Sequence, residues 1–441
     1  MSTEFVADLP AVLRERSRFA PERPQGLDKT TKRTLSKRGV MWLGQTCNLR
    51  CYFCYFLNRI ADAQHEEHPF MTLEKAKEVC HTLRYHYGNT AIDIQGGEPT
   101  IHPEILDLIR YCDEIGLYPT LITNGLVLAK PEKLAEFKQA GIRDFLVSLH
   151  GIGEIHDEVV CRKGAYEKII AAIENMVAQE VPFRFNCTMS KPVVPILPEI
   201  ARKAVQYGAR AVNFIAFNPF EDQETGIRTH ENVAKYSDIK PKLNEAMDIL
   251  EAAGIECNVR YLPLCMAEEK HRKNFYNLQQ LPYDHHEWDY ASWMWTGMQP
   301  QRMKGGKLNP PYKLGRYARR LYLTNPQELV ERSEKAPLRE RLFYAAQGVV
   351  SKAGELVKGR EYWYHREGKA RAIMDLHYQQ HEKCGQCSLR NICDGFHGDY
   401  ANFYGTDEAA PVTGMPVVDD PRYYIRAQEK VVEKEDAAWA L

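Results

Sequence analysis

The chain has 441 residues, of which 44% are hydrophobic and 27% are charged, as in ordinary globular proteins. Its length predicts two or three domains. Lys and Arg total 58 against 59 Asp and Glu, and the resulting net charge of −1 argues against a general nucleic-acid-binding protein. No apolar run approaches the roughly 18 residues of a membrane span, and residues 1–18 lack the apolar core of a signal peptide. We therefore expect a cytoplasmic protein without a transmembrane segment, for which peripheral membrane contact stays open.

Residues 1–38 are predicted to form an irregular N-terminal arm, because they combine prolines and a basic run with little apolar periodicity. Six short apolar runs then alternate with six helical patterns between residues 39 and 256. The predicted strands are 40–43, 91–95, 119–123, 144–149, 183–189 and 211–217. The predicted helices are 72–87, 103–115, 131–140, 165–179, 197–207 and 233–253, the first with Thr72 as its N-cap. This alternation predicts an α/β fold, a partial (β/α)6 barrel of the TIM type, with ligands at the carboxyl ends of its strands.

Residues 257–441 are predicted to form a second, α+β domain with an insertion at about 270–380. The insertion contains an aromatic-rich stretch at 285–295 and a stretch at 301–327 that has seven Lys or Arg and no Asp or Glu. Helical patterns follow near 326–351 and 362–380. The aromatic and basic stretches favour an anionic or amphipathic substrate, and a solvated basic surface over core aromatics is an equally good interpretation.

The chain contains 12 cysteines, too few for a disulfide scaffold in a protein of this length. Six of them lie in two clusters, Cys47/Cys51/Cys54 and Cys384/Cys387/Cys393. In a reducing compartment, clustered thiols indicate metal or redox sites and scattered thiols indicate packing.

The first cluster is a CxxxCxxC motif directly after the first predicted strand. Three thiolates on one tight loop can ligate three irons of a [4Fe–4S] cluster. The fourth iron then stays open to an exogenous ligand, as in catalytic metal sites that keep a free position. A zinc loop is the alternative for this motif taken alone.

With this motif at the head of six βα units, the sequence resembles the radical SAM superfamily. The resemblance covers about residues 40–257 and includes Gly96-Gly97-Glu98-Pro99, which is similar to the family's GGEP motif. It implies that the cluster binds S-adenosylmethionine and cleaves it to a 5′-deoxyadenosyl radical, which takes hydrogen from a substrate. Catalytic Cys47, Cys51 and Cys54 would hold this cluster.

The same resemblance implies which residues contact S-adenosylmethionine. Gly96 and Gly97 would allow close backbone approach, and Glu98 would accept from the methionine ammonium. Phe53 matches the aromatic position whose backbone meets the adenine. Ser148 and Asn186 are expected to contact the ribose or the carboxylate; Asn186 lies on the same strand face as Arg184, since strand side chains alternate.

The second cluster resembles the SPASM or twitch extensions of radical SAM enzymes, which hold auxiliary Fe–S clusters. Cys384, Cys387 and Cys393 would need a fourth ligand for an auxiliary [4Fe–4S] cluster. We predict Cys265 for this role and place Cys257 in packing; His397 and Asp394 are weaker candidates. A structural zinc site is the competing interpretation.

The sequence therefore predicts a radical SAM enzyme that acts on a small, sugar-like or lipid-like molecule and receives electrons from a flavodoxin- or ferredoxin-type reductant. The first alternative is a radical SAM maturase of a ribosomal peptide, although 38 residues before the barrel are few for a peptide-recognition domain. The second is an Fe–S electron carrier or sensor without radical turnover, which would need no substrate-sized cavity.

Overall fold

The structure is a computed structural model that describes residues 27–32, 38–54, 68–86, 89–217, 228–280 and 377–433, and short helical pieces between 338 and 358. The aromatic stretch 285–295 and the basic stretch 301–327 lie outside the described residues, as do most of the helical patterns at 326–351 and 362–380. None of the described helices is both long and apolar enough to cross a membrane.

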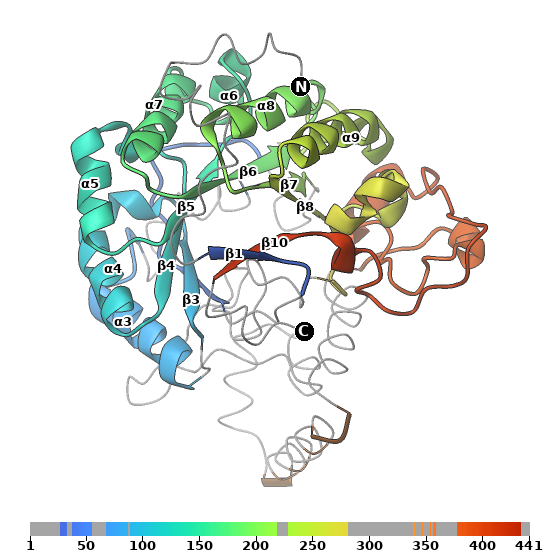
Figure 1. The fold of residues 1–441 in the computed structure, drawn as a ribbon, viewed down its shortest axis with the longest axis horizontal. Helices are drawn as coiled ribbons and strands as arrows, with labels where there is room; N and C mark the ends of the chain where they lie inside the picture. The colour runs from blue at the N-terminus through green and yellow to red at the C-terminus, as the bar shows by residue number, and fades with distance from the viewer. Residues whose placement is uncertain are drawn as a thin grey trace.

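A curved, fully parallel sheet of eight strands, in chain order β2 to β9, forms the main body (Figure 1). The strands are β2 (Arg38–Trp42), β3 (Ala91–Gln95), β4 (Tyr118–Thr123), β5 (Asp144–Ser148), β6 (Phe183–Met189), β7 (Ala211–Ala216), β8 (Glu256–Arg260) and β9 (Phe275–Tyr276). Each strand pairs only with its neighbours in sequence, so the sheet is a partial barrel rather than a closed one.

The helices lie along the outer side of this sheet (Figure 1). They are α3 (Leu73–His81), α4 (Ile105–Glu114), α5 (Pro131–Gln139), α6 (Glu154–Val159), α7 (Ala165–Ala178), α8 (Leu197–Tyr207) and α9 (Tyr236–Ala252). The Lys75 backbone N–H donates to Thr72 Oγ1 at 3.3 Å, which confirms Thr72 as the cap of α3. A π-helical turn, Thr82–His86, follows α3.

The partial barrel confirms the predicted fold class, but the sheet has eight strands where six βα units are predicted. The six predicted strands are β2 to β7, each within two residues of its predicted bounds. The sheet continues through β8 and β9. A short strand-like run at 259–264 overlaps only the end of β8, and the two-residue β9 is too short to show a periodic pattern.

The two faces of the sheet differ in chemistry. The helix-covered face carries apolar side chains of the main buried core, one from each of β3 to β7: Ile92, Leu121, Val147, Phe185 and Phe214. The opposite, concave face carries polar side chains, because strand side chains alternate between faces. Arg38 donates to Asp93 at 2.8 Å and to Thr120 at 3.0 Å on this face.

The N-terminal arm is not wholly irregular, since Leu27–Thr30 forms strand β1 and pairs antiparallel with the last strand, β10 (Lys430–Glu433). This ribbon lies on the concave side of the sheet beside β8 (Figure 1). The buried Lys430 ammonium donates to Glu256 at 2.6 Å and to Asn258 at 2.7 Å, which joins the ribbon to β8.

The described residues of the predicted second domain that follow β8 pack beside α9 and β8 (Figure 1). Its elements are the 3-10 turns Leu264–Met266, Glu269–Asn274, Glu382–Gln386 and Ile425–Ala427, helix α14 (Gly398–Tyr404) and β10. Gln379 forms an isolated antiparallel bridge with Phe396, so the end of the helix predicted at 362–380 is extended instead.

Candidate functional site

Cys47, Cys51 and Cys54 lie together on the loop that follows β2, at the carboxyl edge of the sheet, and each is half-buried. The loop is tightly turned, because the Cys54 N–H donates to the Cys51 carbonyl at 3.0 Å. The Leu49 backbone N–H points at Cys47 Sγ from 3.4 Å. One short loop thus presents three thiols to the same edge.

A clamp made by the end of α6 and the turn before α7 holds this loop from outside. The Tyr52 and Arg50 backbone N–H groups donate to the carbonyls of Val159 and Val160, at 3.3 and 3.4 Å. Arg162 donates to the Asn48 carbonyl at 2.8 Å. Sequence reasoning missed this clamp, because no local motif connects residues more than a hundred positions apart.

The three thiols lie in surroundings that disfavour free thiolates. Burial, with a smaller contribution from the Glu98 charge, raises the pKa of Cys47 to about 12. Burial and the neighbouring Cys54 and Cys47 also raise the pKa of Cys51 well above its usual range. Thiolates here need a nearby cation, and a bound metal group supplies one. The site therefore fits a metal-thiolate centre.

The glycines of the GGEP motif pack directly against the segment that leads into the cysteine loop. Gly97 N–H donates to the Gly44 carbonyl at 2.9 Å, and Glu98 N–H donates to the Thr46 carbonyl at 2.8 Å. A Cβ atom on Gly97 would lie 2.0 Å from the Thr46 carbonyl oxygen, which is far inside van der Waals contact. The backbone group that lies closest to Gly97 is thus the Thr46 carbonyl of the protein itself.

Glu98 is 1% exposed and ties β3 to β4. Its Oε1 accepts from Thr100 N at 3.0 Å, from Thr100 Oγ1 at 2.5 Å and from Thr123 Oγ1 at 2.6 Å. Its Oε2 accepts from Asn124 N at 2.8 Å. Burial raises the pKa of Glu98, and these donors oppose the rise. A carboxylate has about four acceptor positions, and Oε1 already accepts three hydrogen bonds whereas Oε2 accepts one. The predicted contact with the methionine ammonium would therefore fall to Oε2.

Aromatic rings line the barrel edge around Phe53. Its ring meets those of His150 at 4.5 Å and Phe217 at 6.3 Å, both edge-on. His150 Nδ1 accepts the Thr188 backbone N–H at 3.0 Å, so the neutral ring carries its proton on Nε2. Burial lowers the pKa of His150 to about 3, which keeps the ring neutral at pH 7. The Phe53 carbonyl accepts from Arg228 at 3.3 Å.

A row of polar residues crosses β5 to β8 on the concave face. The strand register places Ser148 beside Asn186, Asn186 beside Asn213, and Asn213 beside Asn258. Asn186 Oδ1 is buried and accepts no hydrogen bond in the described structure. Arg184, on the same face, is bound instead to Asp144 at 2.8 Å. The structure thus brings the two predicted contacts, Ser148 and Asn186, side by side, and Asn213 and Asn258 continue the row.

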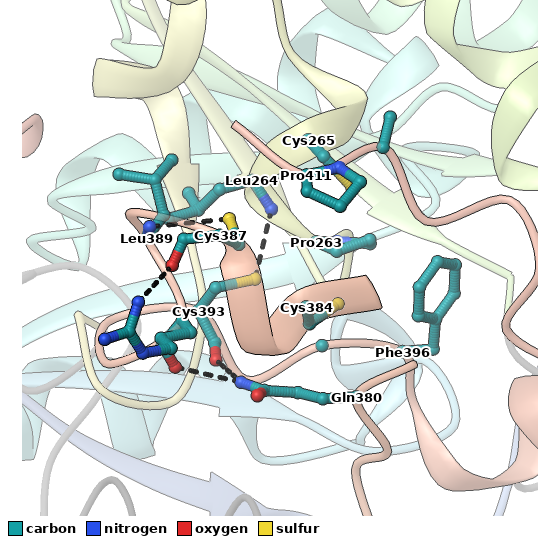
Figure 2. Close-up of a pocket in the computed structure, with 13 residues that line it drawn as sticks. Pro263, Leu264, Cys265, Gln380, Cys384, Cys387, Leu389, Cys393, Phe396 and Pro411 are labelled. Carbon is teal, nitrogen blue, oxygen red and sulfur yellow. Dashed lines mark hydrogen bonds between the residues drawn. The ribbon is translucent and has the colours of Figure 1, made fainter. Parts of the chain in front are cut away.

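The second cysteine site joins residues from both ends of the second domain. Cys265, in the turn after β8, and Cys384, Cys387 and Cys393 line one pocket with about 370 Å³ of empty space, open solvent included (Figure 2). Cys257, by contrast, is buried in the core on β8, as predicted. Asp394 accepts from the Leu278 N–H at 2.5 Å and does not line the pocket, nor does His397.

Backbone N–H groups point at the sulfur atoms of this pocket (Figure 2). Cys387 Sγ accepts from Leu389 and Val412, each at 3.4 Å, and Cys393 Sγ accepts from Leu264 at 3.5 Å. Such donors stabilise thiolate ligands. In the described part of the chain, no three His, Cys, Asp or Glu side chains are gathered closely enough to hold a single metal ion. The four thiols line one pocket, so they are available together as ligands of one metal group.

Comparison with known proteins agrees with this geometry. Residues 43–194 match the family model of the Radical SAM superfamily. The chain is 30% identical over 188 residues to AdoMet-dependent heme synthase of Methanosarcina barkeri (strain Fusaro / DSM 804), over 42% of this chain and 52% of that protein. It is 36% identical over 148 residues to GTP 3′,8-cyclase of Peptoclostridium acidaminophilum, over 32% and 43% of the two chains.

A PqqA peptide cyclase, from Bradyrhizobium diazoefficiens, is 26% identical over 164 residues, which cover 37% of this chain and 42% of that protein. The chain thus spans about half, or less, of the length of these curated relatives. Among solved structures, native anSMEcpe with bound AdoMet aligns with 85% of this chain and 92% of its own, at 17% identity and a TM-score of 0.47. SuiB of Streptococcus suis bound to S-adenosylmethionine covers 54% and 52%, at 17% identity and a TM-score of 0.42.

Proposed function

Because residues 43–194 match the model of the Radical SAM superfamily, we propose that this chain is a radical SAM enzyme that cleaves S-adenosylmethionine at a [4Fe–4S] cluster held by Cys47, Cys51 and Cys54, and that the resulting radical takes hydrogen from a small molecule. The single observation that carries this proposal is the joining of the cysteine loop to the GGEP turn, through Gly97 and Glu98. When bound, the cluster supplies the electron that splits S-adenosylmethionine and so yields the radical that takes hydrogen from the substrate.

We propose that different residues bind different parts of S-adenosylmethionine. The three thiols leave one iron open, and Glu98 Oε2 lies beside the loop to accept the methionine ammonium. Asn186 offers a buried oxygen without a hydrogen bond among the described residues, which suits a ribose hydroxyl. Ser148 lies beside Asn186 in the row of polar residues, and the Phe53 ring packs against His150 at the carboxyl edge of the sheet.

We propose that the second site holds an auxiliary [4Fe–4S] cluster with Cys265 as the fourth ligand. The shared pocket and the N–H groups aimed at Cys387 and Cys393 support thiolate ligation. The similarity of residues 43–194 to the Radical SAM superfamily favours an iron–sulfur cluster over a single zinc ion at this site. A flavodoxin- or ferredoxin-type protein would be the external reductant.

The substrate we propose is a small, sugar-like or lipid-like molecule. Relatives named as heme synthase and GTP cyclase support small-molecule chemistry. The relative named PqqA peptide cyclase favours the second candidate, modification of a ribosomal peptide. Incubation with separate peptide, sugar and lipid fractions, followed by mass spectrometry of the products, distinguishes the two candidates.

The test of the proposed activity is release of 5′-deoxyadenosine by anaerobically reconstituted protein given dithionite and S-adenosylmethionine. We expect release from the wild-type protein and none above background from the Cys47→Ala/Cys51→Ala/Cys54→Ala variant. Equal release from both proteins would refute the assignment of the cluster.

Metal analysis of the same triple variant tests the auxiliary cluster, which should leave about four irons per chain. Cys265→Ala, added to the triple variant, should lower this number, and Cys257→Ala is the matched control that should not. Stoichiometric zinc in place of iron would show that the site is structural and that the auxiliary cluster is wrong.

A further inference from the structure

The cysteine turn at the first site has a counterpart at the second site. Residues 47–50 read Cys-Asn-Leu-Arg, and residues 387–390 read Cys-Ser-Leu-Arg. In both turns the leucine side chain is buried, and the leucine backbone N–H donates to the cysteine Sγ at 3.4 Å. The two sites therefore share one local structure that orients a sulfur atom.

The arginine of each turn binds the carbonyl oxygen of its cysteine. Arg50 donates to the Cys47 carbonyl at 2.6 Å, and Arg390 donates to the Cys387 carbonyl at 3.0 Å. Neither guanidinium forms an ion pair with a described carboxylate. Among the described residues that line the second pocket, Arg390 is the only Lys, Arg, Asp or Glu. A positive charge thus lies at the edge of this pocket, bound to the backbone of a cysteine.

Lys240 makes a third contact of this kind. It lies on α9, and its ammonium donates to the Cys265 carbonyl at 3.1 Å. Lys240 forms no ion pair with a described residue, whereas Lys242, two positions later, pairs with Glu245 at 2.9 Å. Burial raises the pKa of the Cys265 thiol, and the Lys240 charge is among the influences that oppose this rise. Two cations therefore approach the second site, from α9 and from the turn at Cys387.

A carboxylate, that of Asp394, acts against these cations. Asp394 follows Cys393 directly; burial raises the pKa of the Cys393 thiol, and the Asp394 charge adds to the rise. The Asp394 carboxylate accepts from the Leu278 backbone N–H and the Gln279 side chain, and the residue does not line the pocket. The cations are thus bound to cysteine carbonyls, whereas this carboxylate is bound to other groups.

We propose that Arg390 and Lys240 are positioning residues that raise the reduction potential of the metal group at the second site. The inference rests on the proposed function, because it takes that group to be an iron–sulfur cluster with Cys265 and Cys387 among its ligands. Reduction adds an electron to a group that four thiolates already make negative, so a nearby positive charge stabilises the reduced form more than the oxidised form. The sign does not depend on Asp394, since removal of either cation makes the surroundings more negative.

The potential is measured on the full chain with the Cys47→Ala/Cys51→Ala/Cys54→Ala substitutions, because iron then remains at the second site alone. The reconstituted protein is titrated anaerobically with dithionite and mediators, and electron paramagnetic resonance follows the reduced cluster. We expect Arg390→Met to lower the equilibrium constant for one-electron reduction about tenfold, which is about 59 mV. Lys240→Met should shift the potential in the same direction. Arg390→Lys, which keeps a positive charge, should restore most of the potential.

Lys242→Met is the matched control, because it removes the same charge from α9 at a position where the lysine is paired with Glu245. This variant should keep the potential of the parent protein. Iron analysis of each variant separates a change of potential from a loss of the cluster. If Arg390→Met binds less iron, Lys240→Met decides the sign of the effect, since Lys240 lies on a separate element.

Two results would overturn the inference alone: an unchanged potential in both Arg390→Met and Lys240→Met at full iron content, or equal shifts in Arg390→Met and Arg390→Lys. Zinc in place of iron at the second site would refute the auxiliary cluster and the inference together. The titration uses no S-adenosylmethionine, so release of 5′-deoxyadenosine by the wild-type protein tests the proposed activity separately.

Discussion

Gly97 shows how one residue can couple two motifs. The cysteine loop and the GGEP turn are separated by more than forty residues in sequence, and they meet because Gly97 has no side chain. The Thr46 carbonyl occupies the space where a Cβ atom would lie. This contact explains the glycine by packing within the protein.

We predict that Gly97→Ala displaces the cysteine loop and lowers both iron content and 5′-deoxyadenosine release by more than tenfold. The reason is that a contact of 2.0 Å to backbone cannot be relieved by a rotamer change. The control is Gly208→Ala, outside both cysteine motifs, because a Cβ atom there would meet nothing within 4 Å. Iron analysis and product quantification are the measurements, and a Gly97→Ala protein with normal iron content would contradict the packing explanation.

Asp144 is a residue whose charge makes the stability of the protein depend on pH. Burial alone would raise the pKa of Asp144, but Arg184, Arg210 and Arg38 outweigh it and hold the pKa well below its usual range. A depressed folded-state pKa stabilises the protein above the unfolded pKa of about 3.9, and this stabilisation is lost as the pH falls below that value.

We predict that Asp144→Asn lowers the free energy of unfolding at pH 7 by about 3–5 kcal/mol, because it leaves buried guanidinium groups without their carboxylate. The difference between variant and wild type should shrink as the pH is lowered from 5 toward 3. Urea unfolding at several pH values measures it, with the exposed Asp107→Asn as the control, which should cost less than about 1 kcal/mol. A pH-independent difference would show that the charge of Asp144 is not responsible.

At the scale of elements, helix α6 and the turn before α7 act on the cysteine loop from outside the barrel. Val159, Val160 and Arg162 each bind a backbone group of this loop. A separate small apolar cluster, against which Cys47 and Cys51 pack, consists of Leu49, Leu126, Val160 and Ala165. The loop is therefore positioned by a helix that follows β5, three strands away.

We predict that Arg162→Ala leaves folding intact but makes the first cluster lose iron severalfold faster in air, because the Asn48 carbonyl loses its 2.8 Å donor. Arg162 is exposed, so the cost in folding free energy should stay below about 1 kcal/mol. Decay of the cluster absorbance in aerated buffer is the measurement. Arg202→Ala on α8 is the matched control, and identical decay of both variants would argue against the clamp.

Across the whole molecule, the β1–β10 ribbon joins the first and last described strands to the far end of the sheet. Lys430 is 1% exposed and Glu256 is 5% exposed, so their ion pair is buried between the ribbon and β8. Lys29, on β1, donates to the Gly254 carbonyl at 2.6 Å from an exposed position. The ribbon is thus fixed by one buried contact and one exposed contact.

We predict that Lys430→Met lowers the free energy of unfolding by about 3–5 kcal/mol, since it leaves the Glu256 carboxylate buried without its cation. Adding Glu256→Gln should recover part of the loss. Lys29→Met, its control on the neighbouring strand, should cost less than about 1 kcal/mol. Denaturant unfolding measures all three, and equal effects of the two lysine variants would show that the buried pair does not fix the ribbon.

The sequence predicts well what is local and periodic. Strands β3 and β6 have their predicted bounds, and the Thr72 cap is confirmed, because alternation and capping depend on neighbouring residues. Cys265 lines one pocket with Cys384, Cys387 and Cys393, and its role as the fourth ligand stays a prediction. Strand β10 escapes prediction because its four residues become a strand only by pairing with β1, about 400 positions earlier.

The functional contacts that sequence reasoning missed are also non-local. Arg162 and Arg228 stand in no recognisable motif, and only the fold brings them to the cysteine loop. The row from Asn186 to Asn213 and Asn258 follows from the register, since parallel neighbours share a row, and Asn258 donates to Asn213 at 3.0 Å. The missing information was the identity and order of the neighbouring strands.

The place of Cys265 in the turn after β8 has a mechanical consequence. A metal group bound to Cys265 and to Cys384 would close a loop of about 120 residues and would therefore act as a cross-link. By chain-entropy reasoning, closing a loop of this size restricts the unfolded chain by several kcal/mol. Oxygen damage to the group would then loosen the attachment of residues 384–393 to the turn after β8, and protease sensitivity would report the loss of iron.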